Sequence, residues 1–219
     1  MTLSMSRVAN SNAEHVQKIL DLLRPLYKND KIEIDYKTPF QLVVATILSA
    51  QCTDKRVNEV TKSFFDKLKT PDDFLVLSST ELEKLIRPTG FFRNKAKNIQ
   101  GAAEMIKRQF NGKIPESLEE LVKLPGFGRK TANVILVELY DKNQGVCVDT
   151  HVIRLSGRLG LTRHKDAVRV ERDLMMLTPQ KSWNEISHFL ILHGRRVCRA
   201  RLPECSRCVL SGFCPSNGV

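Results

Sequence analysis

The chain has 219 residues, a formal net charge of +11 at pH 7 and six cysteines. A chain of this length can bury one large or two small hydrophobic cores, so disulfide bonds are not needed to stabilise it. The N-terminus has no apolar run of signal-peptide length, and no uncharged apolar run reaches about 18 residues, which argues against secretion and a membrane span. We therefore expect a soluble intracellular protein, cytoplasmic or at the nucleoid if its source is prokaryotic.

The charge balance points to the class of partner. Lys and Arg number 35 against 24 Asp and Glu, and this excess favours a polyanion. Nucleic acid is the first candidate. A membrane surface is less favoured, because the basic residues are spread along the chain and do not cluster beside an anchor. The alternative is a basic, well-solvated surface without such a partner.

Apolar residues recur at helical spacing in almost every long segment, and no segment reads as a convincing strand. The first helix is expected over 13–27. Thr38 and Pro39 match the N-cap and first position of a helix that runs through Leu48. Thr53 can cap the next helix. That helix is expected to carry a core stripe of Val57, Val60, Phe64 and Leu68.

The second quarter of the chain also has a helical pattern. Two short helices are expected, over 71–77 and 79–86, and a longer one over 93–110 should end before Asn111-Gly112. The connections are short, and the chain has neither a low-complexity stretch nor a repeat. The fold class is therefore all-α and compact, with any domain division made by packing and not by a linker.

Two sequence pairs match the capping box, in which a side chain and a backbone amide satisfy each other at a helix start. One pair is Ser117 with Glu120, and the other is Ser182 with Glu185. Helices are expected to begin at both places.

The segment LPGFG, residues 124–128, joins an expected helix over 118–123 to another over 129–140. Gly126 and Gly128 permit positive φ and carry no Cβ, so backbone amides can approach a phosphate closely. The second helix adds its unpaired N–H groups and the positive end of its dipole at the same place. This geometry suits a DNA backbone, whereas the bland alternative is an ordinary turn between helices.

Other glycine-rich phosphate motifs fit less well. A dinucleotide fingerprint needs a third glycine where Thr131 stands, and a P-loop needs a glycine directly before its lysine, where Arg129 stands. Neither motif would be preceded by a strand here. We therefore predict that Gly126, Gly128 and Arg129 contact DNA.

The LPGFG hairpin, the following GRKTANVIL and the segment VDTH at 148–151 together resemble the endonuclease III family of DNA base-excision glycosylases, in the helix-hairpin-helix superfamily. The match extends from about Pro39 to Pro215. It implies a bifunctional DNA glycosylase and AP lyase that acts on oxidised pyrimidines in double-stranded DNA and on abasic sites. We expect a monomer with no membrane partner.

The resemblance also implies two helical domains. Residues 32–143 would form a six-helix barrel with the helix-hairpin-helix motif. Residues 1–31 and 144–219 would together form a discontinuous iron-sulfur cluster domain.

Lys130 and Asp149 are the candidate catalytic residues. An amine attacks carbon only when it is uncharged, and the positive end of the helix dipole and Arg129 both disfavour the charged form of Lys130. Asp149 can cap the helix that starts at Thr150, and a fixed carboxylate could stabilise positive charge on the sugar. The resemblance implies that Lys130 is the nucleophile and forms a Schiff base, and that Asp149 activates the attack. A solvated helix charge and a simple cap are the alternatives.

Extrusion of a base from the duplex leaves a gap that a side chain must fill. LSAQCTD, residues 48–54, resembles the family's LSAQATD loop, which implies that Gln51 enters the vacated space. GFFRNK, residues 90–95, resembles the loop that supplies an apolar wedge. Phe91 stands where the family has leucine, but Phe92 adjoins it, so the sequence does not decide which of the two inserts. The alternatives are a loop-capping glutamine and two core phenylalanines.

Four of the six cysteines lie within 17 residues, as Cys198-x6-Cys205-x2-Cys208-x5-Cys214. Structural zinc commonly uses two Cys-x2-Cys knuckles, and only one is present, so an iron-sulfur cluster is favoured over zinc. The spacing also resembles the family's 4Fe-4S signature. A cluster here would fix a loop that presents Arg199 and Arg201 to phosphates; a redox-sensing role is the alternative.

Three further residues have less specific settings. Cys52 and Cys147 are expected to be buried free thiols. His151 is expected to be a hydrogen-bonded structural histidine rather than a proton carrier.

Two other function classes compete with the lyase. The first is a monofunctional mismatch or adenine-type glycosylase that uses water in place of lysine. Lys130 argues against it, as does the lack of an acidic residue over 43–49. The second is a non-enzymatic helix-hairpin-helix DNA-binding protein or an iron-sulfur electron carrier. The joint presence of Lys130, Asp149 and Gln51 argues against pure binding.

Overall fold

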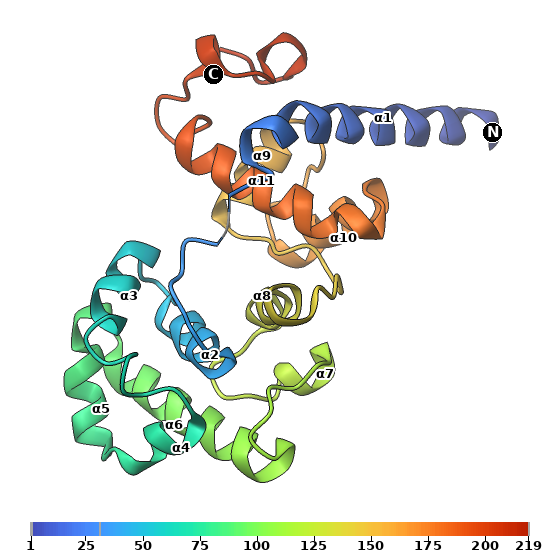
Figure 1. Cartoon of the computed structure of the whole chain (residues 1–219). Coiled ribbons are helices and arrows are strands. Elements are labelled where there is room, and N and C mark those ends of the chain that lie inside the picture. Colours follow the sequence, from blue (N-terminus) through green and yellow to red (C-terminus); the bar gives the residue numbers. More distant parts are fainter. Residues whose placement is uncertain (1, 31, 219) are drawn as a thin grey trace. The chain divides into compact units, whose positions relative to one another are not determined.

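The computed structural model describes residues 2–30 and 32–218, with side chains from residue 13 onward. Every regular element in this part of the chain is a helix (Figure 1), which confirms the all-α prediction. The chain divides into two compact units, residues 1–30 with 143–219 and residues 31–142. These boundaries fall one residue before those expected from the sequence.

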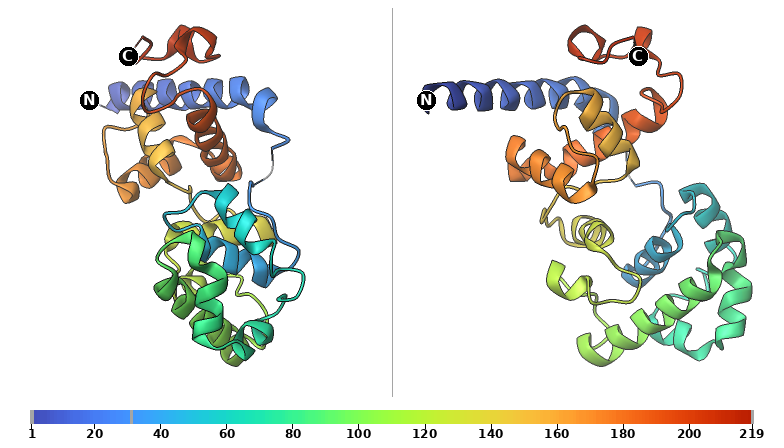
Figure 2. Two further views of the ribbon diagram at one scale, coloured as in Figure 1. Left: turned by 90° about the vertical axis from the view of Figure 1, so that its left-hand side faces the viewer. Right: turned by 180° about the vertical axis from the view of Figure 1, so that it is seen from behind.

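The discontinuous unit contains both ends of the chain. Its α-helices are α1 (Thr2–Tyr27), α9 (Thr150–Arg158), α10 (Ala167–Leu177) and α11 (Trp183–Arg196), and its 3-10 turns are η2 (Gln180–Ser182), η3 (Cys205–Arg207) and η4 (Ser211–Phe213). α1 packs against α10 and α11, so the first and last segments of the chain share one core (Figure 2). The core is built from apolar faces that include Ile19, Leu23, Leu155, Phe189 and Leu190.

The continuous unit holds the remaining helices. They are α2 (Pro39–Leu48), α3 (Asp54–Thr61), α4 (Pro71–Val76), α5 (Ser79–Ile86), the 3-10 turn η1 (Arg87–Thr89), α6 (Phe92–Phe110), α7 (Leu118–Leu121) and α8 (Arg129–Tyr140). The long helix α6 packs against α4, α5 and α2, and α2 also packs against α8. This packing buries a second core, which includes Leu42, Phe74, Leu82, Ile99, Ile106 and Leu136.

Local sequence signals set most helix starts. Thr38 accepts a hydrogen bond from the N–H of Gln41, and the Gln41 side chain accepts one from the N–H of Thr38, which completes a capping box before Pro39. Thr53 caps α3 in the predicted way. Ser117 caps α7 by accepting a hydrogen bond from the N–H of Glu120, and its hydroxyl donates to the Glu120 carboxylate at 2.9 Å. These caps satisfy N–H groups that have no partner inside the helix.

The helix that follows Thr53 is shorter than the apolar stripe suggested, because α3 ends at Thr61 and the chain continues in turns. Ser63 donates its hydroxyl to the carbonyl of Val60. The buried Gln41 amide donates to the carbonyls of Phe65 and Leu68 at 2.5 and 2.9 Å. A side chain from another helix therefore takes the backbone acceptors of this segment, which periodicity in the sequence does not reveal.

The predicted capping box of Ser182 with Glu185 is wrong. Ser182 makes no side-chain cap on α11. The Glu185 carboxylate instead accepts hydrogen bonds from Nε and Nη2 of Arg24 at 2.6 and 2.8 Å. A bidentate pair with an arginine is stronger than a bond to a neutral backbone amide, so the contact between α1 and α11 prevails over the local cap.

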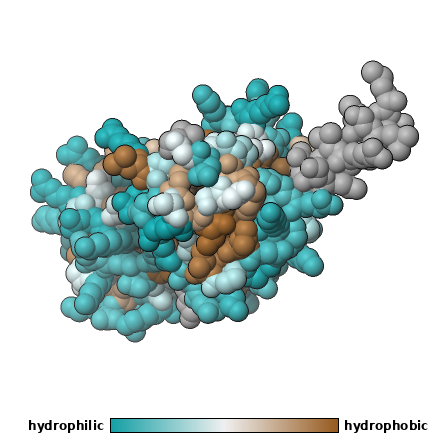
Figure 3. Space-filling view, turned by 90° about the horizontal axis from the view of Figure 1, so that it is seen from above, coloured by the Kyte–Doolittle hydropathy of each residue, from teal (hydrophilic) through white to brown (hydrophobic). Residues whose placement is uncertain are grey.

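The molecular surface is mostly polar on the face drawn in Figure 3, where apolar side chains occupy only limited areas. Within residues 2–30 and 32–218, no helix has the length and apolar character needed to cross a bilayer.

Candidate functional site

The hairpin between α7 and α8 is held by a hydrogen bond from the N–H of Phe127 to the carbonyl of Leu124 at 3.0 Å. Gly126 has a φ of +82°, and a Cβ there would lie 2.8 Å from the side-chain nitrogen of Asn98 in α6. A larger residue at this position would be strained by the left-handed backbone and would have to displace the Asn98 side chain.

Gly128 does not use the conformational freedom that glycine permits. Its φ is −115°, which is extended backbone open to any residue, and a Cβ would meet nothing within 4 Å. Its exposed backbone is open to a close approach. Gly128 is the N-cap of α8 and supplies no side-chain cap.

The first turn of α8 carries the two basic residues singled out from the sequence. Arg129 and Lys130 are its first two residues, and both are exposed. The helix start combines positively charged side chains with the positive end of the helix dipole. This combination attracts anions.

Gln51 and Phe91 have a shared and unusual backbone geometry. Gln51, in the turn between α2 and α3, has a φ of 52°, and Phe91, the N-cap of α6, has a φ of 48°. Both are exposed, and 65% of Phe91 is accessible. Left-handed backbone is uncommon for residues other than glycine, above all for an aromatic one, and such strain concentrates at functional positions.

Phe92 is in a different environment from its neighbour. It packs against the core of its unit, and the guanidinium groups of Arg87 and Arg93 lie over its ring at 5.9 and 5.5 Å from the centroid. A packed ring of this kind anchors the start of α6. Only Phe91 of the pair projects as an exposed ring.

Asp149 caps α9, which confirms the predicted N-cap. Its Oδ1 accepts hydrogen bonds from the N–H groups of His151 and Val152 at 2.8 and 2.9 Å. Capping uses one carboxylate oxygen and fixes the direction of the other. Val148, immediately before it, is buried and anchors the approaching chain.

Helix α9 contacts the cysteine-rich segment through two arginines that sequence reasoning missed. Arg154 donates from Nε and Nη2 to the carbonyl of Cys198 at 3.3 and 3.0 Å. Arg158 donates from Nη1 to the Sγ of Cys198 at 3.2 Å and to the carbonyl of Arg199 at 2.8 Å. Their spacing of four residues, which places both on one helix face, was the available signal.

His151 is hydrogen-bonded, as predicted. Nη2 of Arg154 lies 3.1 Å from its Nδ1. Burial lowers the pKa of His151, with the charge of Asp149 opposing the shift. Neither Cys52 nor Cys147 forms a disulfide bond, as expected, but both are half-buried and not fully buried.

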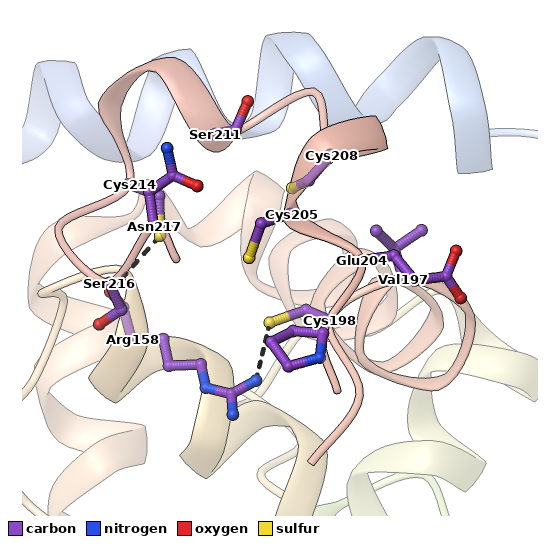
Figure 4. A pocket seen from close by; sticks show the side chains of 11 residues that line it. Arg158, Val197, Cys198, Glu204, Cys205, Cys208, Ser211, Cys214, Ser216 and Asn217 are labelled. Atoms are coloured by element: carbon purple, nitrogen blue, oxygen red, sulfur yellow. Dashed lines mark hydrogen bonds between the residues drawn. The ribbon is translucent and has the colours of Figure 1, made fainter. Parts of the chain in front are cut away.

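The four clustered cysteines line one cavity, together with Arg158, Val197, Pro203 and Glu204 (Figure 4). Their sulfur atoms point toward this common space. The empty volume is about 340 Å³ when the part that opens to solvent is included, so the enclosed part of the cavity is smaller.

The donor atoms that line this cavity include four thiols. In the part of the chain with described side chains, no group of three or more His, Cys, Asp or Glu is arranged to hold a metal ion. A donor set of four cysteines is one that structural zinc and iron-sulfur clusters both use.

A buried histidine completes the surroundings of Cys208. His193 is 1% exposed; its Nδ1 lies 3.0 Å from the hydroxyl of Tyr27, and its Nε2 lies 3.2 Å from the Sγ of Cys208. Burial, followed by the charge of Arg207, lowers the pKa of His193 to about 4.

Crowding also affects the Cys208 thiol. Burial raises its pKa, the N–H of Leu210 lowers it, and the other three cysteines raise it again. Four thiolates in one small space repel one another unless a positively charged group neutralises them.

The basic residues between the first two cysteines differ in their contacts. Arg199 pairs with Glu204 at 2.5 Å, and Glu204 also contacts Arg207. Arg201 is exposed. Exposed ion pairs of this kind are weak, so Arg199 can exchange Glu204 for another anion.

The predicted site residues are distributed over both units. Gln51, Phe91, the hairpin and Lys130 belong to residues 31–142, whereas Asp149 and the four cysteines belong to the discontinuous unit.

Comparisons with known proteins cover nearly the whole chain. Residues 44–180 match the HhH-GPD superfamily base excision DNA repair protein family. Endonuclease III of Synechocystis is 51% identical over 213 residues, which are 97% of each chain. The structure of a non-covalent endonuclease III-DNA complex matches with a TM-score of 0.88 and 40% identity, covering 94% of this chain and 96% of that one. A trapped covalent endonuclease III-DNA intermediate matches with a TM-score of 0.87 and 40% identity, over the same shares.

Proposed function

The chain belongs to the HhH-GPD superfamily of base excision DNA repair proteins, and we propose that it is a bifunctional DNA glycosylase and AP lyase of the endonuclease III type. Its substrate would be double-stranded DNA with oxidised pyrimidines or abasic sites. The observation that carries this proposal is the position of Lys130. It is an exposed lysine in the first turn of α8, which directly follows the glycine hairpin and has no side-chain cap. In a prokaryotic cell the protein would act on nucleoid DNA.

Lys130 is the proposed nucleophile. Its neutral amine attacks C1' of the damaged nucleotide, the glycosidic bond breaks, and the base leaves with the bonding electrons. Opening of the sugar ring produces a protonated Schiff base between Nζ and C1'. Loss of a proton from C2' then expels the 3' phosphate by β-elimination, and hydrolysis of the Schiff base releases the enzyme.

Asp149 is the proposed electrostatic partner. Its Oδ1 is occupied by the two N–H groups at the start of α9, so the carboxylate is held in one orientation. A fixed negative charge would stabilise the cationic sugar as the glycosidic bond breaks. It would also assist deprotonation of Lys130 when the amine attacks.

The hairpin is the proposed anchor for the DNA backbone. The N–H groups of Gly126 and Gly128, the start of α8 and Arg129 would bind phosphate oxygens. Arg199 and Arg201 would add contacts from the cysteine-rich segment. Such contacts predict binding that weakens steeply with added salt.

Gln51 and Phe91 are the proposed residues that replace the extruded nucleotide. Phe91 is favoured as the wedge because its ring is exposed, whereas the ring of Phe92 packs against the core. The Gln51 amide would contact the partner base left behind, since an amide can both donate and accept hydrogen bonds. Filling the gap offsets the free energy of unstacking.

Cys198, Cys205, Cys208 and Cys214 are the proposed ligands of a 4Fe-4S cluster. The all-thiol donor set and the cavity that it lines support such a group. When bound, the cluster would supply positive charge that neutralises the thiolates and a covalent frame for the loop. The chain's own contribution is to hold that loop, through Arg154, Arg158 and His193.

Borohydride reduction tests the proposal directly. Wild-type protein mixed with a thymine-glycol duplex should become covalently attached to the DNA, and Lys130→Ala should not. Lys123→Ala is the matched control, because Lys123 is also exposed but lies before the hairpin. Absence of trapping by the wild type, or normal trapping by Lys130→Ala, would overturn the mechanism. Base release without strand cleavage would instead indicate a monofunctional glycosylase, and binding alone a non-enzymatic protein.

A further inference from the structure

Lys95 is a lysine in the core of the continuous unit. Only 3% of it is exposed, and it lies one helical turn from Ile99 on the buried face of α6. Its Nζ donates hydrogen bonds to the carbonyl of Leu48 and to the carbonyl of Thr89, both at 2.8 Å.

These two carbonyls have a common position in the fold. Leu48 is the last residue of α2, and Thr89 is the last residue of η1. Carbonyls at helix ends lack partners within the helix, and the end of α2 carries partial negative charge. A cation between them satisfies both acceptors.

The segments that follow the two carbonyls carry the proposed DNA-inserting residues. Gln51 comes three residues after Leu48, and Phe91 comes two residues after Thr89. Both have left-handed backbone conformations, which persist only where the surroundings hold them in place. One ammonium group therefore hydrogen-bonds to the backbone just before both turns.

A charge at this place is expensive for stability. Burial lowers the pKa of Lys95, while the nearby Cys52 opposes the shift. Removing an ammonium from water costs several kcal/mol, and an apolar side chain of similar volume often serves the core as well or better. Core packing alone does not account for a lysine here.

We propose that Lys95 is a positioning residue for nucleotide extrusion, which holds the turns of Gln51 and Phe91 in one fixed arrangement so that both side chains enter the duplex together. This inference rests on the proposed function. Lys95 touches neither the substrate nor the reacting atoms, and it acts through the two backbone carbonyls.

The test compares two substrates that differ in the need for extrusion. Lys95→Met, which keeps the length of the side chain but loses the donors, should excise thymine glycol from duplex DNA about tenfold or more slowly, since small misplacements have large effects on rate. Cleavage of a preformed abasic site in single-stranded DNA should stay within about twofold of wild type. Lys97→Met is the matched control, because Lys97 lies exposed on the same helix.

Two further measurements separate positioning from a general loss of structure. Fluorescence of 2-aminopurine placed opposite the lesion should rise less with Lys95→Met than with wild type, because stacking of that base would be disturbed less. The double variant Lys95→Met with Phe91→Ala should lose less than the product of the two single losses, since both changes affect the same step. Lys95→Gln, which restores one or two donors, should recover part of the rate.

The possible outcomes lead to different conclusions. Equal losses on both substrates, or fully multiplicative losses in the double variant, would overturn the positioning role. Failure of both Lys95→Met and Lys95→Gln to fold would also overturn it, because the lysine would then hold the fold itself. If wild type cleaves neither substrate, the proposed function itself fails.

Discussion

Arg158 donates a hydrogen bond from its guanidinium group to the Sγ of Cys198, at the opposite end of α9 from the cap at Asp149. The same guanidinium binds the carbonyls of Arg199 and Ala200 at 2.8 and 3.2 Å. One helix therefore connects the proposed electrostatic partner of catalysis to the proposed cluster loop. The cluster would influence DNA repair by stabilising this connection.

Replacement of Arg158 with methionine should weaken cluster retention. The variant loses a charge-assisted bond to a thiolate and two bonds to the loop backbone, each worth about 1–3 kcal/mol. Iron per protein chain and the visible absorbance of the cluster should both fall faster on exposure to a chelator. Arg163→Met is a suitable control, because Arg163 is exposed and lies outside the cysteine cavity. Equal retention in all three proteins would show that Arg158 does not support the loop.

Two substitutions of Asp149 should separate capping from catalysis. Asparagine caps helices about as well as aspartate, so Asp149→Asn should change the free energy of unfolding by only a few tenths of a kcal/mol, whereas Asp149→Ala should lose about 1 kcal/mol. Both should lower the rate of base excision on the order of 100-fold, because both lack the negative charge. Urea unfolding and single-turnover excision measure the two effects. If Asp149→Asn kept full activity, Asp149 would serve only as the N-cap of α9 and not in catalysis.

The two glycines of the hairpin should respond differently to alanine. Gly126→Ala places a Cβ against Asn98 and a non-glycine residue at positive φ, and the backbone term alone costs about 1–2 kcal/mol. Gly128→Ala meets no neighbouring atom, so its unfolding free energy should stay near that of wild type. Its affinity for abasic-site duplex should nevertheless fall, because the Cβ holds phosphate away from the backbone amides. Thermal denaturation and DNA titration would contradict this account if Gly128→Ala lost stability but bound normally.

Glu138 should make stability depend on pH. Burial raises its pKa above the unfolded value near 4.5, and the hydroxyl of Tyr36, which donates to the carboxylate at 3.5 Å, opposes the shift. The folded protein thus binds more protons than the unfolded chain between these two pKa values. This group's contribution to stability is therefore present below pH 4.5 and is lost as pH rises through the folded pKa.

Glu138→Gln removes the free-energy cost of ionising a buried carboxylate and keeps an acceptor for the Tyr36 hydroxyl. The variant should have a higher urea midpoint than wild type at pH 8, and the difference should shrink toward zero near pH 4. Glu83→Gln, at a partly exposed position of α5, controls for loss of one negative charge. A pH-independent difference between variant and wild type would contradict the raised pKa.

Several features of this protein depend on residues close together in sequence, and the sequence by itself determined them. Helix starts at Thr38, Thr53 and Asp149 follow from a polar side chain that reaches amides two or three residues ahead. The glycine hairpin and the spacing of the four cysteines are likewise local patterns with few structural solutions. The all-α class followed because these signals agreed along the chain.

Only the tertiary structure decided which partner a side chain takes when a distant one competes with a near one. Glu185 binds Arg24 in α1 in place of the local cap. The Gln41 side chain donates hydrogen bonds to two carbonyls in the segment after α3, which lie 24 and 27 residues away in the sequence. Lys95 occupies an apolar register of α6, yet its two acceptors lie on other elements. Which of Phe91 and Phe92 is exposed was also decided by the tertiary structure. Phe92 packs against a core that the other helices of its unit create, and Phe91 does not. Hydrogen bonds and packing across long loops have no periodicity in the sequence, so only the folded chain shows them.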